Sequence, residues 1–293
     1  MHVEECCFAL LNHILPEVDS DRSGLTIDIG VGTFAFYCLL FKQLGFTSIA
    51  VEPVPNDELK QICDRDGIKL WESCITETDG MVSIYMGTWK GSENTNLCST
   101  RSDWWGIENK SKQVMSMTLP TLLKQELVNE ITCMKIDIEG TEIDVINQLL
   151  DIPDILLPLV LMFEYGGGDL KSSKQGGWNS DIYSGTLKCL EVLRVLDYKE
   201  IILIDSAPDF SANIYDLSSI HSFDEIFPEY ANYGNIIASR DRILSQLDLD
   251  RITSKFISTN ASNTSIQPNI NVNTNINKNI LTRVLNKIKR YFS

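Results

Sequence analysis

From residue 25 onward the chain alternates short, β-branched apolar runs with longer segments of helical period. Strands that are buried on both faces are near-continuous apolar runs, and a helix between two of them connects parallel neighbours. The expected strands are residues 25–29, 48–51, 68–73, 132–136, 157–163, 200–204 and 235–238. The expected helices are residues 33–44, 56–66, 140–150 and 183–197. This rhythm predicts an α/β fold whose mostly parallel sheet carries helices on both faces.

Three further segments lie before, within or after this alternating pattern of strands and helices. Within residues 1–24, the apolar side chains of residues 4–15 share one helical face, so a helix that packs on the core is expected before the main domain at 25–240. Residues 80–118 begin like an antiparallel strand and continue rich in Gly, Ser, Asn and Trp, and they are interpreted as an insertion near a site. Residues 241–257 are expected to form a C-terminal helical extension.

The end of the chain differs in composition from the rest. Residues 258–279 are rich in Asn, carry one charge, Lys278, and hold too little apolar mass for a core, which predicts a disordered linker. Residues 280–293 place apolar side chains on one helical face and basic ones elsewhere, which predicts a short basic amphipathic helix. Such a helix could dock on the acidic body of the protein, on a protein partner or peripherally on an anionic membrane.

Charge and cysteine usage exclude several classes of protein. A formal net charge of −15 repels a phosphate backbone, so no nucleic-acid partner is expected. The eight cysteines lack the spacing of a zinc site, and the first residues carry acid where a secretory signal carries base. Apolar runs stay well below the ~18 residues of a membrane span. A reducing, cytoplasmic location is therefore expected.

The first strand runs into a glycine turn, Asp28-Ile-Gly30-Val-Gly32-Thr33. Glycines allow a sharp turn and let a ligand approach the main chain. Glu52 ends the next strand, where a carboxylate can accept hydrogen bonds from both ribose hydroxyls of a nucleotide. The pattern also fits NAD, but an Asp28 carboxylate pointing into the pocket would repel a pyrophosphate and suit a sulfonium and an ammonium. The turn therefore favours S-adenosylmethionine.

A second acidic turn follows the strand at 132–136. Asp137, Glu139 and Glu142 stand within six residues around Gly140. Carboxylates in such a place can cap the next helix and interact favourably with its dipole. The same groups at the mouth of the sheet could instead line a site, and both interpretations stay open for each of them.

Four motifs follow one another between about residues 25 and 205. They are Asp28-Ile-Gly-Val-Gly-Thr33, Val51-Glu-Pro-x-Pro55, Cys74-Ile-Thr-Glu-Thr-Asp-Gly80 and Lys135-Ile-Asp-Ile-Glu-Gly-Thr-Glu142. In this order they resemble the FkbM family of S-adenosylmethionine-dependent methyltransferases. The resemblance implies a class I methyltransferase fold, Rossmann-like, with seven strands of which the last is antiparallel. It also implies O-methylation of a hydroxyl on a carbohydrate or natural product.

The resemblance further implies which residues bind the cofactor, S-adenosyl-L-methionine. The implied set is Asp28, Gly30, Gly32, Thr33, Glu52, Pro53, Cys74, Ile75 and Asp137. Within this set the glycine turn would line the methionine part, Glu52 would bind the ribose, and Cys74 with Ile75 would stand beside the adenine. An adenine ring needs an apolar slot, and the end of the third strand is where the next wall of the crevice must stand.

Methyl transfer to a hydroxyl requires groups that hold the acceptor oxygen and withdraw its proton. Asp137 and Glu139 lie beside the expected cofactor site, and Glu164 ends the strand at 157–163. The hypothesis is that Asp137 or Glu139 orients or deprotonates the acceptor, with Glu164 on the acceptor side. No metal is assigned, although carboxylate oxygens would also suit Mg²⁺ or Ca²⁺.

The acceptor pocket is expected to include the insertion and the segment after Glu164. Trp89, Trp104 and Trp105 could stack on a sugar face, and the glycines at 166–168 permit a mobile lid. Tryptophans in loops also serve local packing, and three glycines also make a simple turn. The expected partner is a small-molecule or glycan acceptor.

Two other classes of function stay open. An NAD(P)-dependent oxidoreductase would share the glycine turn and Glu52, but it would give no reason for the motif around Asp137. A non-catalytic methyltransferase-like scaffold, tethered through the tail, would keep the fold alone.

Overall fold

The apolar runs form one large sheet in the computed structural model, which describes residues 2–89, 92–207 and 210–256. In sheet order the strands are β11 (Ser211–Asp216), β10 (Glu200–Asp205), β12 (Tyr233–Ser239), β9 (Val160–Gly166), β8 (Ile131–Ile136), β1 (Leu25–Ile29), β2 (Thr47–Val51) and β3 (Lys69–Trp71). The strands from β9 to β3 are parallel, and β12 is antiparallel to both neighbours. The predicted Rossmann-like α/β fold with an antiparallel last strand is confirmed.

The sheet carries one strand beyond the seven that the resemblance implied. This strand, β11, pairs antiparallel with β10 at the edge of the sheet. Half of its sequence, Ser-Ala-Asn-Ile-Tyr-Asp, is polar, and its residues are largely half-buried. An edge strand of this kind needs no continuous apolar run, so the hydrophobic pattern does not reveal it.

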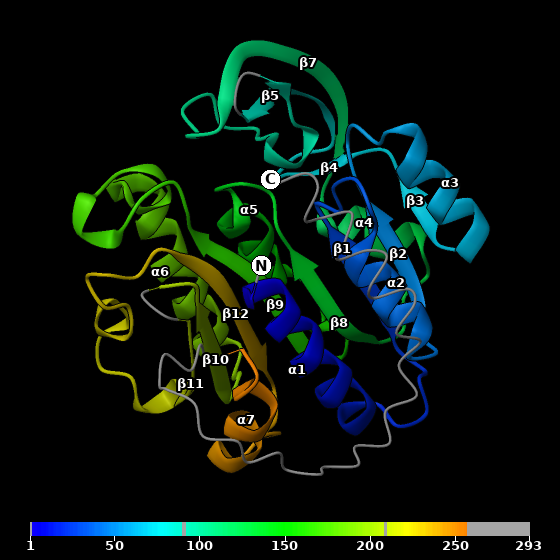
Figure 1. Ribbon diagram of the computed structural model, residues 1–293. Helices are drawn as coiled ribbons and strands as arrows, with labels where there is room; N and C mark the ends of the chain where they lie inside the picture. The colour runs from blue at the N-terminus through cyan, green and yellow to red at the C-terminus, as the bar shows by residue number, and fades with distance from the viewer. Residues whose placement is uncertain (1, 90–91, 208–209, 257–293) are drawn as a thin grey trace.

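Helices cover both faces of the large sheet (Figure 1). On one face lie α1 (His2–Val18), α2 (Phe36–Gln43) and α7 (Gln246–Thr253), with α3 (Asp57–Asp66) beside α2. On the other face lie α4 (Leu119–Gln125), α5 (Glu142–Ile146) and α6 (Ser180–Val195). Successive strand residues serve opposite faces, so Cys133 packs in the cluster of α1 whereas Met134 packs in the cluster of α6.

The helices differ from the expected ranges mainly at their ends. The segment expected as one helix at 140–150 forms α5 and then a 3-10 helix at Asn147–Asp151. Helix α4 was not expected; its N-cap Thr118 accepts a hydrogen bond from the N–H of Thr121. Within the described ranges, no helix is long and apolar enough to cross a membrane. The predicted linker and basic helix at 258–293 lie outside the described residues.

A smaller sheet is built from residues that the sequence analysis assigned largely to the insertion. Its strands, in sheet order, are β4 (Cys74–Ile75), β7 (Ile107–Met117), β5 (Gly80–Trp89) and β6 (Ser92–Glu93). Strands β5 and β7 form a long antiparallel pair, and the loop between them carries a 3-10 turn at Thr95–Leu97. Figure 1 shows this pair above β1 and β8. The small sheet thus covers the edge where open α/β sheets bind ligands.

Candidate functional site

A cavity of about 640 Å³ lies at the carboxyl ends of β1, β2, β8 and β9. Its walls come from the glycine turn after β1, the turn after β2, strand β4 and the acidic turn after β8. The loop of the small sheet, the segment after β9 and the first turn of α1 complete the lining. Segments from both ends of the domain therefore meet around one space.

The glycine turn is shaped by its neighbours as well as by the space for a ligand. Gly30 has a φ of +79°, and a Cβ there would fall 1.7 Å from the carbonyl oxygen of Asp137. Gly32 has a φ of +65°, and its Cβ would fall 2.7 Å from Oδ1 of Asn96. Beside it, Thr33 Oγ1 donates a hydrogen bond of 2.9 Å to the same Oδ1. The turn is thus fitted to the acidic turn on one side and to the small sheet on the other.

Glu52 lies at the end of β2 with its carboxylate in the cavity wall. It accepts hydrogen bonds from the N–H of Gly32 at 3.1 Å and from the N–H of Val54 at 3.0 Å. Burial raises the pKa of Glu52 to about 7, although both backbone bonds favour the charged form. Pro53 follows it in the same wall. A carboxylate so fixed can accept further hydrogen bonds from ribose hydroxyls.

The far end of the cavity is apolar. Cys74 and Ile75 of β4 line it together with Ile84 of β5. Burial raises the pKa of the Cys74 thiol to about 12, so the thiol is neutral at physiological pH. A neutral, apolar wall of this kind suits a flat base.

Asp28 does not occupy the position that the sequence analysis expected. Its carboxylate is 1% exposed and lies behind the cavity wall instead of pointing into the pocket. Asp28 Oδ1 is 3.3 Å from Lys135 Nζ, which also lies 3.1 Å from Asp137 Oδ2 and donates to the carbonyl oxygen of Gly30 at 2.9 Å. A buried carboxylate needs such a partner, and here the partner is part of the protein.

Lys135 is the central cation of the site. Burial alone would lower the pKa of Lys135, but Asp137 and Asp28 outweigh burial and raise that pKa above its usual range. Lys135 belongs to one of the four sequence motifs but was not among the predicted site residues. One signal could have revealed it, because a lysine inside an apolar strand, two residues before Asp137, must face the same side as that carboxylate.

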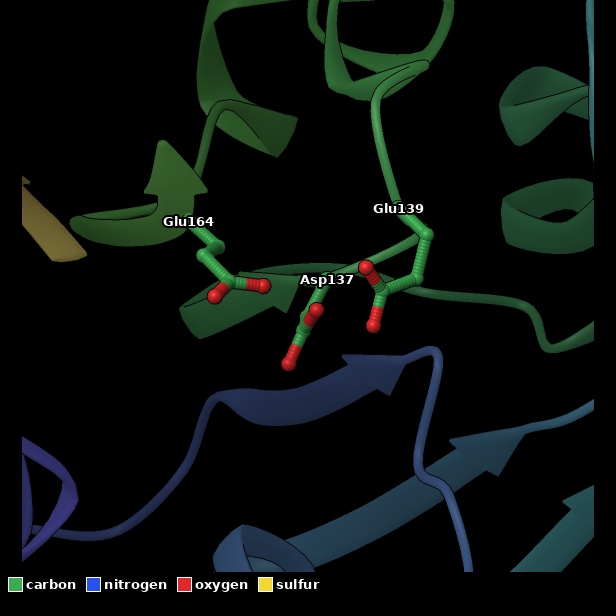
Figure 2. A group of neighbouring side chains, drawn as sticks. All are labelled: Asp137, Glu139 and Glu164. Carbon is green, nitrogen blue, oxygen red and sulfur yellow. The ribbon is translucent and has the colours of Figure 1, made fainter. Parts of the chain in front are cut away.

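Three carboxylates converge on one another in the cavity wall. Figure 2 shows Asp137 and Glu139 from the turn after β8, and Glu164 from β9, with their carboxylates turned toward one another. Oxygen atoms of the three groups lie within 4.8 Å of one another. Glu139 holds a left-handed backbone conformation with a φ of +60°, and its carbonyl oxygen accepts a hydrogen bond from Ser99 Oγ at 2.7 Å. The small sheet thereby fixes the turn that carries two of these three carboxylates, which together are called the triad below.

Burial and mutual repulsion act together on this triad. Burial is the larger cause that raises the pKa of Glu139 and of Glu164, and the charge of Asp137 raises both further. A carboxylate with a raised pKa is a stronger base than a free one, which favours its use as a general base. The arrangement can therefore accept a proton from a bound hydroxyl group.

The capping interpretation applies to Glu142 rather than to the triad. Glu142 Oε1 accepts hydrogen bonds from the N–H groups of Ile138 and Gly140, so this carboxylate stabilises the turn before α5. Asp137 and Glu139 instead line the cavity. The two interpretations that the sequence left open thus apply to different members of one motif.

The triad is also the set of described residues that could hold a divalent cation. Its carboxylate oxygens are hard ligands of the kind that Mg²⁺ and Ca²⁺ bind. The ammonium of Lys135, 3.1 Å from Asp137 Oδ2, already compensates part of the charge of the triad.

Helix α1 contributes an acidic residue that the sequence analysis did not assign. Glu4 lines the cavity, accepts a hydrogen bond of 2.5 Å from the hydroxyl of Tyr37, and accepts another of 3.2 Å from Asn235 Nδ2. Burial raises the pKa of Glu4. No local pattern in residues 4–15 identifies it, because its partners come from α2 and β12.

Two of the three tryptophans expected at the acceptor pocket line the cavity. Trp104 is 6% exposed and Trp105 is 39% exposed, and their ring centroids are 6.0 Å apart. A Cβ on Gly140 would fall 2.7 Å from Trp104, and one on Gly168 would fall 3.1 Å from Trp105. The glycines therefore let the rings pack closely on the main chain. The side chain of Trp89 lies outside the described part of the structure.

The cavity is strongly acidic as a whole. The carboxylates that line it are Glu4, Glu52, Asp137, Glu139 and Glu164. Among the described residues, Lys135 is the one Lys or Arg of this lining. A cationic ligand is favoured by such a lining, and an anionic one is repelled.

Residues 27–186, more than half of the chain, match the sequence model of a family described as "Methyltransferase FkbM domain". No curated protein is similar enough to count as a match. Of 21 solved chains that match, one is described as "METTL16 MTase domain". It is 12% identical, has a TM-score of 0.42, and the match covers 82% of this chain and 68% of that one.

Proposed function

This chain belongs to the FkbM methyltransferase family, and on that premise we propose that it is an S-adenosylmethionine-dependent O-methyltransferase acting on a hydroxyl of a carbohydrate or natural product. The observation that carries the proposal is the acidic lining of a nucleotide-type cavity. In that lining the glycine turn and Glu52 face the same space as the triad of Asp137, Glu139 and Glu164.

The residues present fit this cofactor better than they fit NAD. Ribose hydroxyls are donors, and Glu52 is an acceptor held at the right end of β2. Because Lys135 compensates the charge of Asp28, the choice between cofactors rests on the carboxylates that line the cavity. They favour a sulfonium and an ammonium and repel a pyrophosphate. When bound, S-adenosylmethionine supplies a methyl group activated by its sulfonium.

The triad serves the acceptor. A carboxylate that takes the proton of a hydroxyl makes its oxygen a better nucleophile. Glu139 and Glu164, whose pKa values are raised, are stronger bases than a free glutamate, and Lys135 holds Asp137 in place beside them. In this proposal Asp137 or Glu139 orients or deprotonates the acceptor hydroxyl, and Glu164 lies on the acceptor side.

The tryptophan side chains that line the cavity favour a sugar-like acceptor. Trp105 is partly exposed and packs on Gly167 and Gly168 beside the triad. An aromatic ring offers its face to the apolar side of a sugar, and carboxylates accept hydrogen bonds from sugar hydroxyls. Both kinds of group meet at this end of the cavity.

Titration calorimetry tests the proposed function directly. The wild-type chain is expected to bind S-adenosylmethionine and S-adenosylhomocysteine one to one, and Glu52→Ala should weaken both at least tenfold. NAD, titrated in parallel, should not bind. Methyl transfer from radiolabelled cofactor to a panel of hydroxylated glycans then identifies the acceptor. Binding of NAD alone would instead indicate an oxidoreductase, and no binding of any of the three would indicate a scaffold.

Removal of divalent cations is expected to leave methyl transfer unchanged. The reason is that the ammonium of Lys135 already lies 3.1 Å from Asp137 Oδ2 and compensates part of the charge of the triad. Initial rates with and without EDTA measure this effect, and Mg²⁺ added back after EDTA tests whether any lost rate is restored. A rate that EDTA abolishes and Mg²⁺ restores would assign the triad to a metal.

Cofactor binding is expected to weaken as the pH falls below 7. Burial raises the pKa of Glu52 to about 7, and only the charged form accepts hydrogen bonds from both ribose hydroxyls. Since the proton must leave before the ligand binds, the Kd should rise about tenfold per pH unit below that pKa. Calorimetry between pH 5.5 and pH 8 measures the slope. Glu52→Gln should bind weakly with this slope removed; an unaltered slope would place the proton on another group.

A further inference from the structure

Asn96 lies where the small sheet meets the glycine turn. It belongs to the 3-10 turn at Thr95–Leu97, outside the four sequence motifs, and it lines the cavity. Its Oδ1 accepts the hydrogen bond from Thr33 and lies 2.7 Å from the position that a Cβ on Gly32 would take. The carboxamide therefore rests on the surface of the glycine turn.

An anionic group of a ligand finds a single Lys or Arg among the described residues that line this acidic cavity. Lys135 Nζ is already shared by Gly30 O and two carboxylates. The N–H of Gly30 donates to Val51 O at 2.9 Å, and the N–H of Gly32 donates to Glu52. The cofactor of the proposed function, on which this inference rests, carries one α-carboxylate beside its two cationic groups. That carboxylate needs a donor near the turn.

The Asn96 carboxamide provides such a donor. Because Oδ1 faces Thr33, the Nδ2 group faces away from that hydroxyl, and it makes no hydrogen bond with the described residues. Asn94 Oδ1 accepts the backbone N–H of Asn96 at 3.1 Å, which fixes the turn that carries the side chain. An amide held in place in this way loses little conformational freedom when a ligand binds.

We propose that Asn96 Nδ2 donates a hydrogen bond to the α-carboxylate of the methionine part of S-adenosylmethionine. The glycine turn and the small sheet then contact the cofactor from two sides. Thr33 orients the amide, and Gly32 lacks a side chain because the carboxamide occupies that space. The small sheet is thus part of the cofactor site as well as the roof of the acceptor site.

The test compares two ligands that differ in the carboxylate. S-adenosylhomocysteine carries it, and its decarboxylated analogue carries hydrogen in its place. Asn96→Ala should weaken S-adenosylhomocysteine about tenfold or more and change binding of the analogue less than twofold. Asn96→Asp has nearly the same shape but places a carboxylate against a carboxylate, so it should weaken S-adenosylhomocysteine further and spare the analogue. Asn213→Ala, at an exposed position of β11, is the matched control.

Each result decides between named explanations. If the wild-type chain binds neither cofactor nor product, the proposed function fails. If the wild type binds and both Asn96 variants bind S-adenosylhomocysteine equally well, the assignment of Asn96 alone is overturned. Equal losses for both ligands would show that Asn96 acts only through the shape of the turn, which also overturns it. Thermal melts of each variant confirm that the compared chains are folded.

Discussion

Replacing Lys135 with methionine is expected to lower the free energy of unfolding by about 3–5 kcal/mol at neutral pH. The side chain of Lys135 is 5% exposed and pairs with Asp28 and Asp137. Methionine keeps most of the volume but leaves the buried Asp28 carboxylate without its cation, and an uncompensated buried charge is costly. Urea denaturation of wild type and variant at pH 7.5 measures the difference. Lys188→Met, at an exposed position of α6, is the matched control.

The loss should be smaller at acid pH. Burial raises the pKa of Asp28, and Lys135 opposes that rise, so the pKa in the variant is higher still. A carboxyl with a raised folded pKa binds a proton that the unfolded chain releases, so this term stabilises the fold as the pH falls. The double variant with Asp28→Asn should recover part of the loss at pH 7.5. This account would be contradicted if Lys135→Met lost the same free energy of unfolding at acid pH as at pH 7.5. It would also be contradicted if the losses of the two single variants simply added in the double variant.

Glu139→Gln is expected to lower kcat by about 10²–10⁴-fold while cofactor affinity changes by less than threefold. The amide keeps the shape of the side chain but cannot take a proton from the acceptor. The left-handed turn at Glu139, held by Ser99, should persist because the substitution does not touch the main chain. Rates with a confirmed acceptor and calorimetry with S-adenosylhomocysteine separate the two quantities.

A pH profile distinguishes a base from a structural residue in this experiment. Because the pKa of Glu139 is raised, the wild-type kcat should rise with pH as this group loses its proton, and Glu139→Gln should lack that limb. Glu191→Gln, the same substitution at an exposed position of α6, should leave rate and profile unchanged. Full turnover by Glu139→Gln would remove Glu139 from the chemistry.

The features that the sequence predicted are local ones. Strands β1 and β8 are mostly apolar and almost fully buried, and the turns that follow them carry Gly30 and Asp137 within a few residues of a strand end. The convergence of Asp137, Glu139 and Glu164 follows from parallel neighbouring strands, whose carboxyl ends meet at one edge of a sheet.

The features that the sequence did not predict depend on contacts between distant segments. Asp28 and Lys135 stand opposite each other only because β1 pairs with β8, and that register turns the expected ligand contact of Asp28 into an internal ion pair. Glu4 and Asn96 enter the cavity from α1 and from the small sheet. Periodicity describes which face a residue occupies within its own element, and it carries no information on which element lies opposite.

Helix α1 precedes the residues that carry the family resemblance, yet it buries Leu10, Leu11 and Leu15 completely against the large sheet. A chain cut back to the matched residues would lose α1 together with β10 and β12. It would expose that face of β8 and β9 to water, and a surface of this kind promotes self-association. The segment that matches the family and the segment that must fold as one unit therefore have different boundaries. The residues that match the family model are fewer than the residues that pack into the core of this protein.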